Sequence, residues 1–373
     1  MNFELTEEQR ALQDSLARLL SDKHGDEQRR ALAASEGGYS PEIWAHFANL
    51  GVTALVVPEV DGGLGGTIVD LMVVMQELGR SSLASPLLGS CVLPAIALQL
   101  DADEITRRQW LAALASGEKQ LAWAHDELGG DCGANWVSTR AIWDGTRWML
   151  EGRKLNVLHA GSADQFLVSA RTAGSDGDPT GRALFLVPAD APGLALRNYR
   201  LIDGTPAGEL LMTGVSATPV SSAPGATAWV GIDAALMVGI VAACADMVGA
   251  METAFRLTTD YLNTRQQFGR LIGQNQALRH KLAEMLVGLE LARSMTMGAA
   301  VCADRPVDRE IRADLHRAKI VVGRYARSLC QMAIQLHGGI GMTQEYPVGQ
   351  YLRRVHVLDQ MFGDAEMHAE KLA

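Results

Sequence analysis

Gln335-Leu336-His337-Gly338-Gly339-Ile340-Gly341 ends a long helical pattern, and the fold can be worked out by moving outward from this stretch. Its glycines interrupt the helix that we expect over Val307–His337, before a last short helix. Two further apolar helical patterns precede it, Gly231–Tyr261 and Gln276–Ala303. Three long helices in succession predict a helical domain over residues 229–373.

The preceding region, residues 119–228, has a different composition. It holds four of the seven tryptophans, and its apolar runs are short and separated by turn residues. Asp144-Gly145 predicts a hairpin turn between two such runs. Gln165–Ser169 and Ala183–Val187 have the β-branched and aromatic content of strands. We therefore expect a small β-barrel or sandwich in the middle of the chain.

Residues 1–118 carry helix-start signals again. Thr6-Glu7-Glu8-Gln9 is a capping box, Ser40-Pro41 supplies an N-cap and a proline at the first helical position, and Thr67 with Asp70 opens a third helix. Helices, then strands, then helices predict an α+β multidomain protein rather than alternating βαβ units. The expected domains are 1–118 (helical), 119–228 (β) and 229–373 (helical).

Composition excludes several classes of function. The chain has 373 residues and 48% hydrophobic residues, so it can bury a core in two or three domains. Its formal charge of −10 disfavours a nucleic-acid binder, which needs cations to follow phosphates. The stretch Ala234–Met251 is broken by Asp246 and is expected to be a buried helix that falls short of a membrane span.

The cysteines and the N-terminus indicate a cytoplasmic protein. Five cysteines lie far apart without a CxxC pair, which predicts neither a disulfide framework nor a metal site. The first residues, Met-Asn-Phe-Glu, lack the basic and apolar regions of a signal peptide.

Arg265-Gln266-Gln267-Phe268-Gly269 is the motif with the clearest chemistry. An arginine held at a helix end beside an aromatic ring suits recognition of a pyrophosphate, because its guanidinium can donate two parallel hydrogen bonds. The alternative is an ordinary surface arginine near a helix C-terminus. His337 is interpreted as structural rather than catalytic, since no serine or cysteine nucleophile with flanking glycines is near it.

Taken together and in order, these motifs resemble the acyl-CoA dehydrogenase family over nearly the whole chain. The segments that carry the resemblance are Pro58–Gly65, Leu114–Glu118, Arg265–Gly269 with Gln276, Ala318-Lys319, Gln335–Gly341, Glu345–Val348 and Tyr351–Arg353. Each segment alone is weak, whereas the ordered set is specific.

The resemblance implies a helical N-terminal domain, a middle β-domain and a C-terminal four-helix bundle, with FAD as cofactor. It implies an acyl-CoA substrate, an electron-transfer protein as acceptor, and a homo- or hetero-oligomer built as a dimer of dimers. The residues that it assigns to FAD, reaching across a dimer, are Arg265, Phe268, Gln276, Gln335, Gly338 and Gly339.

The catalytic base implied by the resemblance is missing. The family removes an α-proton from the thioester with a glutamate near the C-terminus, and here Phe362 occupies that position. A minority of the family places the base near the position of Gly239, where this chain has no carboxylate either. Asp364 is a possible displaced base, although its match in the family contacts FAD, so the catalytic residue stays unassigned.

The positions that line the flavin in the family also differ. Asp126 replaces a threonine, and Asn156 and Leu158 replace the Trp and Thr of a Trp-x-Thr segment. An aspartate brings negative charge towards a group that must accept a hydride, which is unfavourable.

Three hypotheses about function stay open. The first is an FAD-dependent acyl-CoA dehydrogenase-like subunit that carries out α,β-dehydrogenation in acyl-CoA degradation. The second is a catalytically silent subunit that completes the FAD site of a competent homologous partner. The third is a self-sufficient enzyme that uses Asp364 as its base. A flavin spectrum from protein expressed alone would separate the second from the other two.

Overall fold

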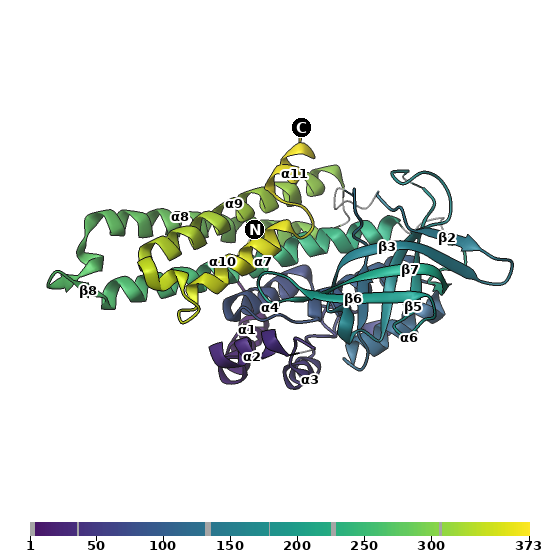
Figure 1. Ribbon diagram of the computed structural model, residues 1–373, viewed down its shortest axis with the longest axis horizontal. Coiled ribbons are helices and arrows are strands. Elements are labelled where there is room, and N and C mark those ends of the chain that lie inside the picture. The colour runs from purple at the N-terminus through teal and green to yellow at the C-terminus, as the bar shows by residue number, and fades with distance from the viewer. Residues whose placement is uncertain (1–3, 36, 131–135, 179, 225–228, 306–307) are drawn as a thin grey trace. The chain divides into compact units, whose positions relative to one another are not determined.

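The computed structural model describes residues 4–35, 37–130, 136–178, 180–224, 229–305 and 308–373 (Figure 1). The chain forms two compact units. Unit 1 comprises Met1–Arg30, Ile68–Leu83 and Ile240–Ala373, and unit 2 comprises Ala31–Thr67 and Ala84–Gly239. Both units take helices from the first 118 residues, and the three-domain boundaries expected from composition stay a prediction.

Unit 1 is built from helices. They are α1 (Glu7–Lys23), α4 (Ile68–Ser81), most of α7 (Trp229–Thr264), α8 (Gln276–Ala303), α9 (Arg309–His337), α10 (Val348–Gln360) and α11 (Ala365–Glu370). The short α2 (Asp26–Ala34) follows α1. Helix α9 packs against α8, α10 and α11, while α4 packs against α1 and α8. The helix expected over Val307–His337 is confirmed from Arg309 onward, and Val307 lies outside the described residues.

Local signals explain where these helices begin. The capping box at α1 is confirmed: the Thr6 hydroxyl accepts from the Gln9 amide at 3.2 Å, and the Gln9 side chain accepts from the Thr6 amide at 3.0 Å. At α4 the first amide, that of Ile68, donates to Asp304 from the end of α8. Thus one helix start is fixed by its own sequence and the other by a distant residue.

Helices α4 and α7 cross in backbone contact. A Cβ added at Gly79 would lie 2.0 Å from the carbonyl oxygen of Asp246, and one at Gly249 would lie 2.0 Å from that of Gln76. Both glycines are required because no side chain fits at this crossing. Beside it, the buried Asp246 carboxylate accepts two hydrogen bonds from Arg354 of α10.

Unit 2 contains the β-structure, which confirms the expected β-rich middle region. Strands β1 (Leu121–Ala124), β2 (Arg140–Trp143), β3 (Trp148–Leu158), β4 (Gln165–Arg171), β5 (Arg182–Pro188) and β7 (Pro206–Pro219) form one sheet, and β6 (Leu194–Arg200) pairs with β7. The sheet closes on itself through β4–β5 pairing into a small barrel (Figure 1). Its core includes Leu150, Phe166, Phe185 and Met212. Helices α3 (Pro41–Asn49), α5 (Leu93–Asp101) and α6 (Glu104–Ala115) belong to the same unit.

The predicted hairpin and strands are confirmed. Trp143 pairs with Trp148, and the Asp144 carboxylate accepts from the amides of Thr146 and Arg147 to close the turn. Strands β4 and β5 pair antiparallel over their whole length.

Two helices are long and apolar enough to cross a membrane by length and composition, Val230–Thr264 and Gln276–Ala303. The sequence prediction was that Ala234–Met251, interrupted by Asp246, falls short of a membrane span, whereas the longer helix Val230–Thr264 passes the test of length and composition. Asp246 is accommodated inside unit 1 by its hydrogen bonds from Arg354. In the most apolar 18-residue segment of each helix, 94% of the first and 39% of the second is buried inside the protein. The first helix is thus the buried helix that the sequence predicted.

Candidate functional site

The structure brings the six residues expected to bind the cofactor to one end of unit 1. Helix α7 ends there, the short hairpin β8 (Gln266–Gln267) and β9 (Arg270–Leu271) follows, α8 begins, and α9 ends (Figure 1). The six residues are all exposed: Arg265, Phe268, Gln276, Gln335, Gly338 and Gly339.

His337 joins the helix ends at this place. Its ring stacks on Tyr261 of α7 with centroids 4.6 Å apart and lies 4.7 Å from the ring of Tyr346. Nδ1 lies 2.7 Å from the Ala333 carbonyl, to which it donates, and burial lowers the pKa of this histidine. A buried, neutral, hydrogen-bonded imidazole agrees with the structural interpretation of His337.

The six residues face solvent and not other residues in the described part of the chain. Phe268 has a left-handed backbone (φ 52°) and is fully exposed. A Cβ at Gly338 or Gly339 would meet no atom within 4 Å. Within the described ranges, the Arg265 side chain makes no ion pair or hydrogen bond. An open glycine pair beside a bare phenylalanine and a guanidinium is typical of a surface that another molecule covers.

The turn between α10 and α11 carries the position of the missing base. Phe362 lies there half-buried with φ 61°, and its ring cannot take up a proton. The turn is held by Lys319 of α9, which is fully buried. Its ammonium donates to four backbone carbonyls at 2.7–3.0 Å: those of Leu358, Asp359, Met361 and Gly363. Lys319 therefore fixes the backbone of this turn, but the side chain that the turn carries at position 362 is apolar.

The Asp364 carboxylate stabilises the start of a helix. It is the N-cap of α11, and one carboxylate oxygen accepts from the amides of Met367 and Glu366 at 2.9 and 3.0 Å. These hydrogen bonds lower the pKa of Asp364. A carboxylate stabilised in its charged form is a weak base, which argues against Asp364 as the displaced base.

On unit 2 a hollow of about 70 Å³ lies at Asp126 and Asn156, which the resemblance aligns with residues that line the flavin. His125, Asp126, Glu127, Trp136 and Asn156 are among the residues that line it. No site residue was predicted here, although Asp126 and Asn156 were recognised as departures from the family.

A buried ion pair forms the base of this hollow. Lys154 of β3 donates to Glu127 at 2.6 Å, to Ser169 at 2.8 Å and to the His125 carbonyl at 3.1 Å, which uses all three ammonium hydrogens. Burial alone would raise the pKa of Glu127, but Lys154 and hydrogen bonds from Ser138 and Thr139 lower it to about 2. Burial lowers the pKa of Lys154, and the charge of Glu127 opposes this effect. The pair links β3 to the neighbouring segments and is structural.

Asn156 is fixed by a tyrosine. Its backbone amide donates to the Tyr199 hydroxyl at 3.0 Å, and that hydroxyl donates to the Asn156 side-chain oxygen at 3.1 Å. The residue has φ 51°, a left-handed conformation that asparagine tolerates better than tryptophan does. Asparagine thus suits the backbone conformation at this position better than the tryptophan of the family would.

Asp126 shares the charge of Lys154 with Glu127, and Glu127 is the one that accepts a hydrogen bond from the ammonium. Burial raises the pKa of Asp126 to about 6, despite the opposing effects of Lys154 and of a hydrogen bond with Asn156. Near neutral pH this carboxyl is mostly ionised, so the hollow presents a negative charge.

This pKa predicts a pH-dependent stability. Between pH 4 and 6 folded Asp126 holds a proton that the unfolded chain has lost, so the free energy of unfolding falls as pH rises through this window. Asp126→Asn should therefore raise the free energy of unfolding by about 1–2 kcal/mol at pH 8 and by much less at pH 4. Urea unfolding at both pH values checks this, with the exposed Asp190→Asn as control. Equal effects at the two pH values would contradict it.

Three family models match the chain in order. They are the acyl-CoA dehydrogenase N-terminal domain over residues 6–118, the middle domain over 121–215 and the C-terminal domain over 229–373. Fold and matches together define an oxidoreductase that acts on acyl-CoA. The chain belongs to the acyl-CoA dehydrogenase family, whose members are FAD-dependent.

Individual relatives agree with this assignment. Acyl-CoA dehydrogenase FadE12 of Mycobacterium tuberculosis is 29% identical over 317 residues, covering 83% of this chain and 81% of the relative. A variant of the Tcur3481-Tcur3483 steroid acyl-CoA dehydrogenase is 29% identical with a TM-score of 0.86, over 98% of this chain and 96% of that one. The ChsE4-ChsE5 complex from Mycobacterium tuberculosis contains a chain 25% identical with a TM-score of 0.87, over 100% and 98%.

The residues present fit FAD at one place and not at another. The exposed Arg265 and the open Gly338-Gly339 pair suit an anionic pyrophosphate, because a guanidinium can donate to it and no side chain blocks its approach. The hollow on unit 2 does not suit a reducible ring, because the Asp126 carboxyl, mostly ionised near neutral pH, places negative charge there.

Proposed function

We propose that this chain acts in α,β-dehydrogenation of an acyl-CoA as one subunit of a hetero-oligomer, in which it completes the FAD site of a homologous partner. The observation that carries the proposal is the asymmetry between the two sets of residues. The set that reaches outward from unit 1 is complete, whereas the base is absent and the flavin-lining positions are replaced.

The chemistry explains why such a chain needs a partner. Removal of the α-proton requires a base in contact with the substrate, and FAD, when bound, accepts the β-hydride. This chain offers Phe362 at the base position and Asp126 near the flavin positions, so neither requirement is met by its own residues. Its contribution is to bind: Arg265 would hold the pyrophosphate, and Gln335 and the Gly338-Gly339 turn would close over the cofactor.

Two of the similar structures support a heteromeric arrangement. Each is named as a pair of proteins, Tcur3481-Tcur3483 and ChsE4-ChsE5. By analogy, the assembly proposed here is a dimer of dimers of two homologous chains, with an electron-transfer protein as acceptor. Four of the five cysteines lie in the described part of the chain and are free thiols, which supports the proposal of a cytoplasmic protein.

The third hypothesis, a self-sufficient enzyme, is less well supported. It needs Asp364 as base, and that carboxylate caps α11 and has a lowered pKa.

The proposal is tested at Arg265. Arg265→Ala in the assembled complex should weaken FAD binding about 10- to 100-fold, because a charge-assisted contact to phosphate is lost. Flavin retained after gel filtration measures this. Arg270→Ala is the matched control, since Arg270 lies on the same hairpin and donates to Asn275. Unchanged flavin content in the Arg265 variant would refute the assignment.

A further inference from the structure

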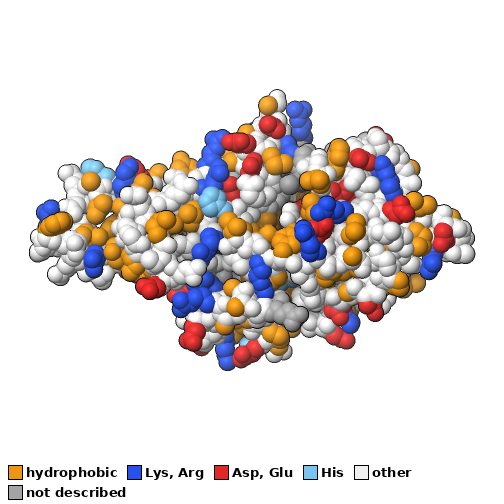
Figure 2. All heavy atoms as spheres, in the orientation of Figure 1, with side chains coloured by type: hydrophobic (Ala, Val, Ile, Leu, Met, Phe, Trp, Pro, Cys, Tyr) orange, Lys and Arg blue, Asp and Glu red, His pale blue; other side chains and the backbone are white. Residues whose placement is uncertain are grey.

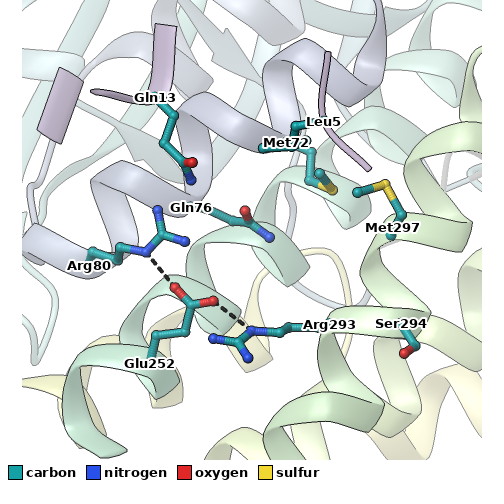
Figure 3. Close-up of a pocket in the computed structure, with 9 residues that line it drawn as sticks. All are labelled: Leu5, Gln13, Met72, Gln76, Arg80, Glu252, Arg293, Ser294 and Met297. Atoms are coloured by element: carbon teal, nitrogen blue, oxygen red, sulfur yellow. Dashed lines mark hydrogen bonds and ion pairs between the residues drawn. The ribbon is translucent and has the colours of Figure 1, made fainter. Parts of the chain in front are cut away.

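A pocket that takes no part in the proposed function lies within unit 1. It has a volume of about 360 Å³ and is lined by residues of α1, α4, α7 and α8 together with Leu5 (Figure 3). This volume is in the range of sites for small organic ligands. Polar side chains lie on one side of it, and Leu5, Met72 and Met297 lie on the other.

The charged groups of the pocket are already paired. Glu252 of α7 accepts from Arg80 Nε with one oxygen and from Arg293 Nε, at 2.7 Å, with the other (Figure 3). Each arginine has a second carboxylate partner, Glu77 for Arg80 and Glu290 for Arg293. Three carboxylates therefore face two guanidinium groups, which leaves one negative charge in excess, and each oxygen of Glu252 has a partner.

Two side-chain carboxamides of the pocket have donors and acceptors that no hydrogen bond within the described residues uses. Gln13 of α1 and Gln76 of α4 line the pocket, and neither side chain makes a hydrogen bond with any residue in the described ranges. Each amide can donate and accept. On the opposite side Met72 is buried and Met297 is half-buried, and flexible thioethers adapt to ligands of varied shape.

We propose that this pocket binds a neutral amphiphilic small molecule, with an amide or hydroxyl head at Gln13 and Gln76 and an apolar body against Leu5, Met72 and Met297. An anionic head would add a fourth negative charge to a cluster that already has one in excess. A cationic head would lose its hydration without gaining a free carboxylate oxygen. A neutral head that both donates and accepts hydrogen bonds avoids both the electrostatic repulsion and the loss of ionic hydration.

The test uses three probes with the same six-carbon chain and a neutral, an anionic or a cationic head: hexanamide, hexanoate and hexylamine. The full chain, labelled with ¹³C in its methionine methyl groups, is titrated with each probe by NMR. Hexanamide should give saturable shifts at Met72 and Met297, and none at Met212 in the core of unit 2. The two charged probes should bind at least ten-fold more weakly.

A pair of variants separates recognition from simple partitioning into an apolar hollow. Gln76→Leu removes one hydrogen-bonding head contact and should weaken hexanamide binding about five-fold, whereas the exposed Gln28→Leu on α2 should change nothing. Absence of a saturable shift at the solubility limit would overturn the proposal. So would equal affinity for the three probes, or equal behaviour of the two variants. None of these readings depends on flavin or turnover, so the proposed function stands or falls separately.

Discussion

Lys319→Met is expected to cost about 3–5 kcal/mol of the free energy of unfolding. The substitution removes the ammonium from which four carbonyls, two in the last turn of α10 and two in the turn after it, accept hydrogen bonds in a mostly buried part of unit 1. Buried acceptors that lose their donor keep the full cost of desolvation. The buried Asp359, whose carboxylate faces Arg327 at 3.2 Å, would lose a neighbouring positive charge as well.

Urea unfolding followed by far-ultraviolet circular dichroism, which reports on the helices of unit 1, measures this loss. Lys281→Met is the matched control, because Lys281 is exposed and forms a surface pair with Glu284 at 2.8 Å. Such pairs are worth about 0–1 kcal/mol. If the two variants had the same unfolding midpoint, Lys319 would not organise this turn.

The second large effect concerns position 362. The isolated wild-type chain should not transfer electrons from any acyl-CoA. In a background in which Asp126→Thr removes the negative charge from the hollow, Phe362→Glu should introduce slow flavin reduction, because a positioned base contributes about 10²–10⁴-fold. The turn held by Lys319 places the new carboxylate where the family has its base. Anaerobic mixing of the purified variant with FAD and straight-chain acyl-CoA substrates, followed at the flavin absorbance, measures the rate.

Phe362→Gln serves as the control for shape, since glutamine matches glutamate in size but cannot take up a proton. Activity in both variants would mean that relief of an apolar blockage, rather than a base, was responsible. Robust turnover by the wild-type chain that Asp364→Asn abolishes would instead establish the displaced-base hypothesis.

Local sequence signals predicted most of the fold. The capping box of Thr6 and Gln9, the Asp144 turn and the paired strands β4 and β5 depend on neighbouring residues, and all are confirmed. The sequence did not distinguish a barrel from a sandwich. That choice depends on which strands pair, here β4 with β5 and β5 with β7, and the periodicity within a strand carries no information on its partners.

The residues that organise the site were harder to find. Lys319 stands among the buried positions of α9, with Leu315, Ala318 and Val322, and a lysine in an apolar stripe was a signal that could have been used. The Tyr199–Asn156 clamp left no such signal, since 43 residues separate its members. The surface of the molecule mixes acidic and basic side chains over most of the visible face, so charge distribution did not indicate the site either (Figure 2).

Sequence reasoning could not show how one buried charge is stabilised. Asp246 lies within the apolar stretch Ala234–Met251, and Arg354, 108 residues further along the chain, donates to it inside unit 1. The penalty of a buried charge depends on its partner, which the local sequence does not contain.

The central claim is that this chain completes a cofactor site in a partner while its own flavin positions are deficient. Co-expression with a homologue that carries the glutamate base, followed by native mass measurement and flavin quantitation, tests it most directly. The account predicts a complex of four chains, two of each kind, with one FAD per two chains. A homotetramer of this chain with one FAD per chain would contradict it.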